Sequence, residues 1–546
     1  MKVGRSYQPL TTYPFWAASS ITASLLVVKF APQFSVRHSY FWTAVAIFGA
    51  QSLIYFIYAV VIYPRFLSPL RHLPEPQTGN SFFNGQFWTM INEPSGIPAR
   101  RWVNEIPNDG LIRYRHLWNR ERLLLTSPKA LAEVLTAKSY DFVKPDLLRI
   151  GIGQLLGIGI LFAEGDEHKM QRKNFMPAFN FGHIKELYPI FWSKSQLMVQ
   201  CLREELDKVS PSTTVEVGEW ASRATLDIIG AAGMGQEFNT LENPDNDLNR
   251  VYRNIFQASQ SARVLAVLQF FVPPILLRNL PLKRNDDVHE AVRIVRETSR
   301  QLIQHKQDQM AQKEKLSPDI ISVALESGGF SHDQLVDNMM IFLAAGHETT
   351  ATAFTWAVYL LAQHQDVQAR LRDEVHAHIP SLSFDGVTHD LIDNHMPYLH
   401  AVCNEVLRVY APVPLTLRDT AVDTSIQGQF VPRGTKIILA PWAINHSTAL
   451  WGPDAAAFNP DRWLAPGQAN AGGATSNYAF LTFLHGPRSC IGAKFAVAEL
   501  ACLLAAFVAS FDFALTDPDE KIDIRGGVTA KPKNGMKVNL KIVEGW

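Results

Sequence analysis

Near its C-terminus the chain reads Phe483-Leu484-His485-Gly486-Pro487-Arg488-Ser489-Cys490-Ile491-Gly492, and an apolar run with helical periodicity, Ala493 to Phe511, follows at once. A cysteine at a helix start gains from the partial positive charge and the free backbone N–H groups there, which favour its thiolate form. Gly486 and Gly492 remove side chains where a flat ligand would press against the backbone. Arg488 offers a fixed cationic fork for a carboxylate. Alone, such a cysteine is more often a small core residue, but these companions favour Cys490 as a ligand.

The pattern F-x-x-G-x-R-x-C-x-G, carried by Phe483, Gly486, Arg488, Cys490 and Gly492, resembles the haem-thiolate signature of the cytochrome P-450 family. Five fixed residue types at average frequencies should occur by chance about once in several thousand chains of this length. The resemblance implies haem b with Cys490 as the axial ligand of its iron, and a propionate contact from Arg488. It also implies that Phe483 packs near the thiolate and tunes its potential.

Helical periodicity dominates the rest of the chain, and short β-like runs are few. No second linker, repeat or low-complexity block interrupts residues 79–546, so we expect one catalytic domain there. The pattern favours a mainly α fold with a minor β sheet, which suits the single large domain of the family. The predicted helices are Gly182–Lys208, Val217–Met234, Asp287–Lys315, Ser331–His364, Pro397–Tyr410 and Gly492–Phe511, and the predicted strands are Leu111–Tyr114, Arg122–Thr126, Thr424–Gln429, Lys436–Ala440 and Lys537–Val543.

The 546 residues include 51 basic and 51 acidic side chains, so the chain is formally neutral at pH 7. A neutral chain lacks the basic footprint of nucleic-acid-binding proteins, and we expect no nucleic-acid partner. The four cysteines are too widely spaced for a disulfide framework or a zinc pattern, which indicates a reducing compartment. Cys201, Cys403 and Cys502 lie in helical pattern and are interpreted as inert core thiols.

Residues 1–63 are interpreted as an N-terminal membrane anchor with one or two spans. The best span, 41–63, carries no charge and would form a helix of roughly 34 Å, long enough to cross a bilayer. Ser6 to Val28 is also uncharged, but Pro9 and Pro14 weaken it, and it could be a first span or an interfacial segment. No convincing cleavage site follows either run, so we expect an uncleaved anchor, not a signal peptide.

Residues 64–78 are interpreted as a stiff, proline-rich hinge with little helix potential, behind which the catalytic domain spans 79–546. Positive charge is nearly balanced around the two apolar runs, so the positive-inside rule leaves the orientation open. The resemblance implies a catalytic domain on the cytosolic face of the endoplasmic reticulum. The prolines of the hinge are Pro64, Pro69, Pro74 and Pro76.

The predicted helix Ser331–His364 begins with a capping-box pattern, in which Ser331 and Gln334 satisfy each other's backbone N–H groups. In its middle, Gly346 costs roughly 1 kcal/mol against alanine, and two threonine hydroxyls compete for backbone carbonyls. We therefore expect a local opening that holds water or ligand. The alternative is a tolerated glycine in a buried helix.

The same helix contains Ala345-Gly346-His347-Glu348-Thr349-Thr350, which resembles the family's oxygen-activation motif A-G-x-E-T-T. The resemblance implies that Thr349 hydrogen-bonds the iron-bound dioxygen or its water, and that Glu348 helps to deliver protons for O–O scission. An acid beside a hydroxyl is what proton-assisted scission requires, and a thiolate ligand pushes electron density toward that cleavage. Glu348 and Thr349 are thus the predicted catalytic residues.

A buried salt-bridge triad is also implied. Glu405 and Arg408 are three residues apart on one helical face and can pair. Arg462 lies in Phe458-Asn459-Pro460-Asp461-Arg462-Trp463, which matches the family's F-x-P-x-R-W segment. The triad Glu405–Arg408–Arg462 is expected to hold the core on the haem side.

Three more side chains are expected to contact the haem propionates. Arg172 and Arg418 match arginines that bind propionates in the family. His168 stands where the family commonly has tryptophan, and its spacing of four places it on the same helical face as Arg172. His168 could therefore also donate to a propionate; the alternative is a solvated polar residue.

The substrate-facing positions implied by the resemblance are mostly apolar, so a bulky lipophilic small molecule is expected. The apolar, proline-broken segment Ala262–Leu282 could be core packing or the family's membrane-dipping loop beside the substrate channel. The implied substrate-facing positions are Ile341, Phe342, Ala345, Val413, Leu415, Thr416 and the Gly526-Gly527-Val528 turn.

Together these features predict a membrane-anchored haem-thiolate monooxygenase that oxidises a lipophilic small molecule with O2. Electrons are expected from NADPH through a separate NADPH–cytochrome P-450 reductase, because the segment after Cys490 is too short for a fused flavin domain. The motif wording is similar to fungal enzymes of secondary-metabolite pathways. Two alternatives stay open: an enzyme of the same fold that rearranges a peroxide without O2, against which Glu348 and Thr349 argue, and a non-catalytic haem-binding protein.

Overall fold

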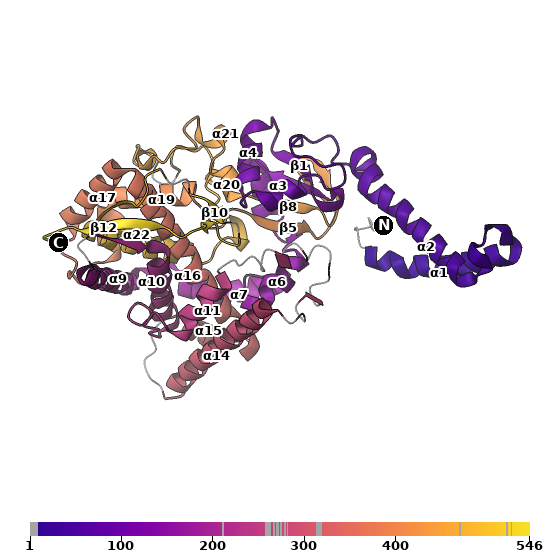
Figure 1. The fold of residues 1–546 in the computed structure, drawn as a ribbon. Coiled ribbons are helices and arrows are strands. Elements are labelled where there is room, and N and C mark those ends of the chain that lie inside the picture. The colour runs from indigo at the N-terminus through magenta and orange to yellow at the C-terminus, as the bar shows by residue number, and fades with distance from the viewer. Residues whose placement is uncertain are drawn as a thin grey trace. The chain divides into compact units, whose positions relative to one another are not determined.

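The computed structural model describes residues 9–546 except 210–211, 257–263, 266–267, 269–271, 273–275, 278–279, 281, 313–318, 469–470, 520–521 and 526. The described residues are mostly helical, with small sheets (Figure 1), which confirms the predicted fold class. The chain divides into two compact units. Unit 1 is Met1–Glu93, Arg101–Val143 and Thr416–Ala440, and unit 2 is Pro94–Arg100, Lys144–Leu415 and Pro441–Trp546.

Unit 1 contains a five-stranded sheet in the order β1-β2-β8-β5-β3. Neighbours pair antiparallel except β2 and β8, which are parallel, and Ile112 lies opposite Leu124 in the β1–β2 pair. These strands are short and rich in Leu and Ile, which pack well on a half-buried pleated surface. Their bounds are β1 (Leu111–Arg115), β2 (Glu121–Leu125), β3 (Phe142–Val143), β5 (Thr416–Thr420) and β8 (Lys436–Leu439).

Around this sheet unit 1 has a hairpin and several short helices. The predicted strand 424–429 is in fact two strands, because Gln427 and Gly428 both have positive φ and form a tight turn between them. The elements are β6 (Thr424–Ile426), β7 (Gln429–Val431), α3 (Phe87–Asn92), η4 (Leu117–Asn119), α5 (Pro128–Ala132) and η5 (Glu133–Ala137), with α4 (Ile97–Glu105) shared between the two units.

Unit 1 begins with two apolar helices, α1 (Pro9–Phe30) and α2 (Tyr40–Ile57), joined by the short turns η1 (Pro32–Phe34) and η2 (Val36–His38). They lie side by side in Figure 1. A π-helical segment, η3 (Tyr58–Leu67), continues α2, and Tyr40–Leu67 is long and apolar enough to cross a membrane. The helix thus runs four residues past the predicted span end at 63, because the π-turn accommodates Pro64.

Unit 2 is built around two long helices, α16 and α22, which pack against each other. Ser331 caps α16, and the predicted capping box with Gln334 is confirmed. Every residue of α22 from Ala498 to Ser510 is buried, which is typical of a helix inside a core. The aromatic rings of Phe354 and Phe507 meet edge to face between the two helices, with centroids 5.4 Å apart.

The remaining elements of unit 2 largely follow the predicted pattern. The predicted helix 182–208 is interrupted at Leu187, because Pro189 lies in the first turn of α9 and cannot continue a preceding helix. The predicted strand 537–543 is found as β12, at the centre of the sheet β4-β12-β9. Most of the predicted segment 262–282 lies outside the described residues.

The helices of unit 2 are α6 (Asp146–Leu156), α7 (Gly165–Phe175), η6 (Met176–Phe179), α8 (Phe181–Glu186), α9 (Tyr188–Val209), α10 (Val217–Ile228), η7 (Ile229–Met234), α11 (Asp247–Phe256), α14 (Lys283–Ala311), α15 (Ile320–Ser327), α16 (His332–Gln363), α17 (Gln365–His378), α18 (His389–His395), α19 (Pro397–Val409), α20 (Pro441–Ile444), α21 (Thr448–Trp451), η8 (Pro460–Trp463), η9 (Asn477–Ala479), η10 (Gly486–Arg488) and α22 (Ala493–Ser510). Its strands are β4 (Ser212–Glu216), β9 (Phe511–Leu515), β10 (Ile524–Arg525), β11 (Lys531–Pro532) and β12 (Lys537–Ile542).

Candidate functional site

The loop before α22 folds back on itself and presents Cys490. The backbone N–H of Cys490 donates to the carbonyl of Phe483 at 2.9 Å, which closes the loop around η10. Leu484 and Gly486 have φ values of 55° and 75°. A backbone with positive φ at Gly486 explains why glycine stands there, since a side chain would be strained in that conformation.

Cys490 differs from the other three cysteines in its surroundings. Its side chain is accessible, whereas Cys403 and Cys502 are buried and Cys201 is half-buried. Desolvation raises the pKa of the Cys490 thiol, while the Gly492 N–H and the Arg172 charge lower it to a lesser extent. The two groups that lower the pKa act in the direction expected for a cysteine at a helix start.

Helix α7 brings Arg172 and His168 to this loop region. Arg172 donates from Nη1 to the carbonyl of Ser489 at 2.6 Å and from Nη2 to the Ser489 hydroxyl at 3.3 Å. His168 lies one turn earlier on α7 and is buried, so the interpretation as a solvated polar residue is wrong. Arg172 is thus held against the residue that precedes Cys490.

Arg488 is engaged by a carboxylate that the sequence did not reveal. Its Nη2 lies 2.7 Å from Oε1 of Glu164, and both side chains are largely buried. The same oxygen accepts the backbone N–H of Lys144 at 2.8 Å, and Oε2 has no hydrogen-bond partner among the described residues. Arg488 therefore binds a carboxylate, as its residue type suggested, but in this structure the carboxylate is a protein side chain.

Arg418 lies in unit 1, on β5. Its side chain is buried, and Nη1 donates to the carbonyl of its neighbour Leu417, 2.8 Å away, and to the Thr416 hydroxyl at 3.3 Å. These two contacts with its own strand fix the direction of the buried guanidinium.

The residues that unit 2 gathers here fit a haem with a thiolate ligand. Cys490 supplies one soft, accessible sulfur donor, which suits a haem iron. Arg172 and Arg488 supply guanidinium groups, the side chains best suited to bind planar carboxylates such as propionates. Phe483, half-buried, packs against the apolar core beside the loop.

The acid of the second motif, Glu348, is buried on α16 and held from the far end of the chain. Its Oε1 accepts from Nζ of Lys531 at 2.6 Å and from the Thr529 hydroxyl at 2.9 Å. The Lys531 side chain is 33% exposed and that of Glu348 5% exposed, so the pair links a solvated group to a buried one. Lys531 and Thr529 were not predicted from the sequence.

Thr349 follows Glu348 on a face of α16 that is only partly packed. Ala345 is exposed and Thr349 partly exposed, although Ala344, Glu348 and Thr350 are buried. The Thr349 hydroxyl donates to the Ala345 carbonyl at 2.8 Å, and the Thr350 hydroxyl donates to the Gly346 carbonyl at 3.4 Å. Both hydroxyls thus bond back to the preceding helical turn, as threonine does inside helices.

The predicted local opening of α16 is not found. The helix is continuous from His332 to Gln363. Gly346 has a packing role, because a Cβ there would lie 2.9 Å from side-chain atoms of Ile229 in η7. The glycine therefore allows η7 to approach α16 closely, which is the second of the two interpretations made from the sequence.

A second buried acid, Glu499, lies on α22. Its side chain is fully buried, and neither carboxyl oxygen has a partner with normal hydrogen-bond geometry among the described residues. Burial raises the pKa of Glu499 well above its ordinary value, and the Thr350 hydroxyl opposes this shift. Burial therefore favours the neutral form of Glu499 beside the second threonine of the motif.

The predicted triad Glu405–Arg408–Arg462 is confirmed. Arg408 donates to both oxygens of Glu405 at 2.8 Å, and Arg462 Nε lies 3.0 Å from Oε1. The Trp463 indole and the Asn459 backbone N–H also donate to this carboxylate, at 2.9 Å each. The fully buried pair is thus compensated by hydrogen bonds on both sides.

The residues expected to face substrate are distributed over both units. Ile341 and Phe342 are buried, Ala345 is exposed, and Val413 and Leu415 are half-buried. In the turn near the C-terminus Gly527 and Val528 are exposed, whereas Gly526 lies outside the described residues. Thr416 belongs to unit 1, and the others belong to unit 2.

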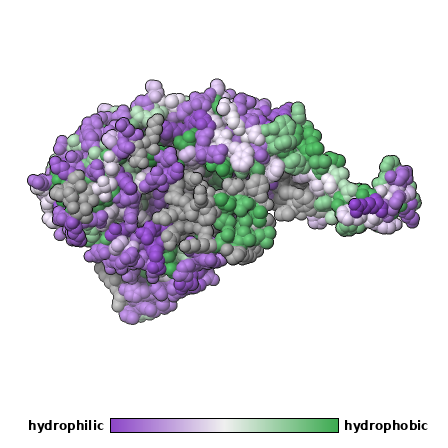
Figure 2. Space-filling view, in the orientation of Figure 1, coloured by the Kyte–Doolittle hydropathy of each residue, from purple (hydrophilic) through white to green (hydrophobic). Residues whose placement is uncertain are grey.

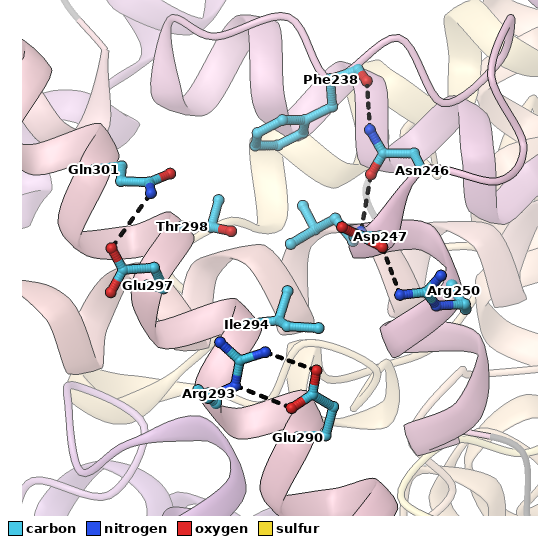
Figure 3. Close-up of a pocket in the computed structure, with 11 residues that line it drawn as sticks. Phe238, Asn246, Asp247, Arg250, Glu290, Arg293, Ile294, Glu297, Thr298 and Gln301 are labelled. Atoms are coloured by element: carbon cyan, nitrogen blue, oxygen red, sulfur yellow. Dashed lines mark hydrogen bonds and ion pairs between the residues drawn. The ribbon is translucent and has the colours of Figure 1, made fainter.

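A separate groove of about 440 Å³ lies between α11 and α14 and contains none of the predicted site residues (Figure 3). Two ion pairs line it. Arg293 donates to both oxygens of Glu290, at 2.7 and 2.9 Å. Arg250 pairs with Asp247 at 2.5 Å. A third carboxylate in the lining, Glu297, accepts from Gln301 at 3.3 Å.

Comparisons with known proteins return one family. The family model described as "Cytochrome P450" matches residues 110–539. Cytochrome P450 monooxygenase sphH of Aspergillus fumigatus is 44% identical over 95% of this chain and 97% of its own length. Cytochrome P450 monooxygenase FUM15 of Gibberella moniliformis is 43% identical over 89% and 91%, and ALT8 of Alternaria alternata is 40% identical over 92% and 95%.

Proposed function

The chain belongs to the cytochrome P450 family, and from this membership we propose which of its residues perform the family's chemistry. It is a haem-thiolate monooxygenase, and its cofactor is haem with a cysteine thiolate as the axial ligand of iron. When bound, the haem supplies the activation of O2. The residues below bind that group, place it and supply protons.

Cys490 is the proposed axial ligand. The observation that carries this assignment is the accessible sulfur of Cys490 in a closed loop, whereas Cys403 and Cys502 are sealed in the core. Cys403 and Cys502 are both 0% exposed, so a group as large as a haem has no access to either sulfur. Arg172, Arg488, His168 and Arg418 are the proposed propionate contacts, and Phe483 and Gly486 shape the loop.

Glu348 and Thr349 are the proposed catalytic residues. The Glu348 carboxyl is buried, and its Oε1 accepts from the partly exposed ammonium of Lys531 and from the Thr529 hydroxyl, so a proton can reach it from the solvent side. Thr349 can rotate its hydroxyl away from the Ala345 carbonyl and present that proton to the ligand side of the helix. Lys531 and Thr529 position the carboxyl for this transfer.

The partners follow from the family in outline. Family members draw electrons from a redox partner and act on lipophilic substrates. We propose a separate NADPH–cytochrome P450 reductase as the electron donor here. The named fungal monooxygenases support a role in secondary-metabolite biosynthesis. The apolar helix Tyr40–Leu67 supports membrane anchoring, and we propose the endoplasmic reticulum with the catalytic domain on the cytosolic side.

The decisive experiment replaces the proposed ligand. Cys490→Ala should abolish the absorption band of the reduced carbon-monoxide complex that is typical of thiolate ligation, because no other accessible thiol lies in this loop. Cys201→Ser, at a half-buried thiol on α9, is the matched control and should keep the band in full. Persistence of the band in Cys490→Ala would refute the assignment.

A further inference from the structure

We infer that α1 is a second membrane span, so that α1 and α2 form a hairpin inside the lipid bilayer. The N-terminus then lies on the same side of the membrane as the residues that follow Leu67. This topology is independent of the residues proposed to hold the haem, because α1 and α2 contain none of them.

The two helices run antiparallel, and contacts at successive levels hold them side by side. The rings of Trp16 and Tyr55 meet edge to face with centroids 4.8 Å apart. One turn further along α1, the Ser20 hydroxyl donates to Gln51 Oε1 at 3.0 Å, one turn back on α2. At the other end, the Val36 backbone N–H donates to the Thr43 hydroxyl at 3.0 Å. Whatever depth α2 reaches, α1 therefore reaches as well.

The polarity of the pair is the reverse of that of a helix pair in water. Its most buried side chains are hydroxyl groups: Ser20 and Ser24 on α1 and Thr43 on α2 are 1–2% exposed. Its outward side chains are apolar and strongly exposed on both helices. A pair in water would bury such side chains and expose the hydroxyls. The exposed apolar residues are Phe15, Ile21, Leu25, Leu26 and Phe30 on α1, and Phe41, Val45, Leu53, Ile54 and Ile57 on α2.

A polar clasp, made by Ser19, Ser20 and Gln51, joins the helices at mid-length. Gln51 accepts from the Ser20 hydroxyl, and its Nε2 donates to the Ser19 hydroxyl at 3.3 Å. Hydrogen bonds of this kind, together with small residues that let backbones approach, hold helices together in lipid, where apolar burial provides no drive. The clasp places polar groups between the helices, so neither helix exposes them to acyl chains.

Length and charge agree with a span and not with a helix lying on the surface. The 22 residues of α1 give about 33 Å as a helix, and its apolar part, Pro14–Phe30, lies at the short end of the length that crosses the hydrocarbon core. A surface helix needs a charged face, but α1 carries no charge before Lys29. Figure 2 shows hydrophilic residues gathered at the tip of the helical pair, with hydrophobic ones along it.

When both apolar runs cross as a hairpin, the flanking charges are no longer balanced, and the distribution of Lys and Arg then assigns the side. The turn between the helices and the last turn of α1 hold Arg37 and Lys29, whereas more positive charge flanks the open end of the hairpin. Because the more positive side faces the cytosol, the open end and everything after Leu67 are cytosolic. In the sequence, Lys2 and Arg5 precede α1, and Arg65 and Arg71 lie at and after the end of η3.

The test places one polar tag with a glycosylation acceptor, Asn-x-Thr, at two positions of the full-length chain in microsomes. One variant carries the tag at the N-terminus, and the other carries it between Pro32 and Val36, in the turn. We expect a glycosidase-sensitive mass shift for the turn tag only. In sealed vesicles added protease should remove the N-terminal tag and digest the catalytic domain.

Each other result overturns the hairpin. A mass shift for both tags would show a single span, with α1 on the lumenal surface. A mass shift for neither would show that the turn stays cytosolic and that the pair does not cross. A shift for the turn tag with a catalytic domain protected from protease would show that α1 crosses and α2 does not.

Discussion

Two helices in the described part of this chain are long and apolar enough to cross a membrane, and their surroundings are opposite. In the span of α2 and η3, Tyr40–Leu67, 6% of the most apolar window is buried, whereas in α22, Ala493–Ser510, the share is 78%. Helices α9, α16, α17 and α19 surround α22, so protein covers it. Composition therefore reports how much apolar surface a helix has, but the neighbours of the helix determine whether protein or lipid covers it.

The largest effect should come from a polar group inside the protein-covered region. Glu405→Ala leaves Arg408 buried without its carboxylate, which costs about 3–5 kcal/mol and should prevent haem incorporation. Haem content per purified chain measures this. The control is Asp461→Ala, which breaks an exposed pair with Arg370 worth about 1 kcal/mol or less. A Glu405→Ala protein with full haem content would contradict the role of the triad.

Trimming one leucine in each helix compares protein and lipid directly. Leu503→Ala in α22 removes a fully buried side chain and should cost about 2–5 kcal/mol of stability. Leu53→Ala in α2 replaces an exposed side chain and should change insertion by less than about 1 kcal/mol without altering the catalytic domain. The two variants are compared by the carbon-monoxide band that remains after microsomes containing each of them are heated. Equal losses would mean that protein also covers α2.

The pH dependence of thermal stability tests whether the Glu499 side chain on α22 is excluded from water. Burial raises the pKa of its carboxyl in the folded chain. The folded state therefore keeps its full stability below about pH 4.5, where the carboxyl is protonated in both states, and loses stability as pH rises toward the folded pKa. Glu499→Gln keeps the shape and removes that loss, so the variant should gain roughly 1–3 kcal/mol over the parent at pH 8 and little at pH 4. Thermal unfolding at both pH values tests this; parallel pH profiles would contradict it.

The smallest effect belongs to the clasp of the membrane pair. Gln51→Leu removes the hydrogen bonds to Ser19 and Ser20 and should weaken the contact of α1 with α2 by about 0.6–1.7 kcal/mol. After cleavage at a protease site inserted in the turn at 31–39, a tagged α1 should dissociate from the remainder at lower temperature than in the parent. Leu53→Ala, on the outward face, is the control. Unchanged retention would show that the clasp contributes nothing.

Much of the site was predictable because its signals are local. The cysteine loop is a contiguous stretch, Glu405 and Arg408 are one helical turn apart, and the capping box spans four residues. Such features depend on spacing, which a sequence displays directly. The mainly α character followed from the same periodicity.

What could not be predicted depends on contacts between distant segments. Glu164 and Arg488, or Glu348 and Lys531, meet only because the fold brings separate helices and a C-terminal strand together. The desolvation that raises the pKa of the Cys490 thiol is a tertiary effect of the same kind, whereas the helix start that opposes it is visible in the sequence. Gly346 was ambiguous until its neighbour Ile229 was placed.

The buried carboxyl of Glu348 on α16 is held by two residues from the C-terminal segment of the chain. Thr529 and Lys531 follow the exposed Val528 on the short segment that leads into β11, so a displacement of that turn moves both partners of the carboxyl at once. Both hydrogen-bond partners of the buried carboxyl therefore depend on the backbone position of one short segment, so a substitution that shifts this segment should alter the two contacts of Glu348 together.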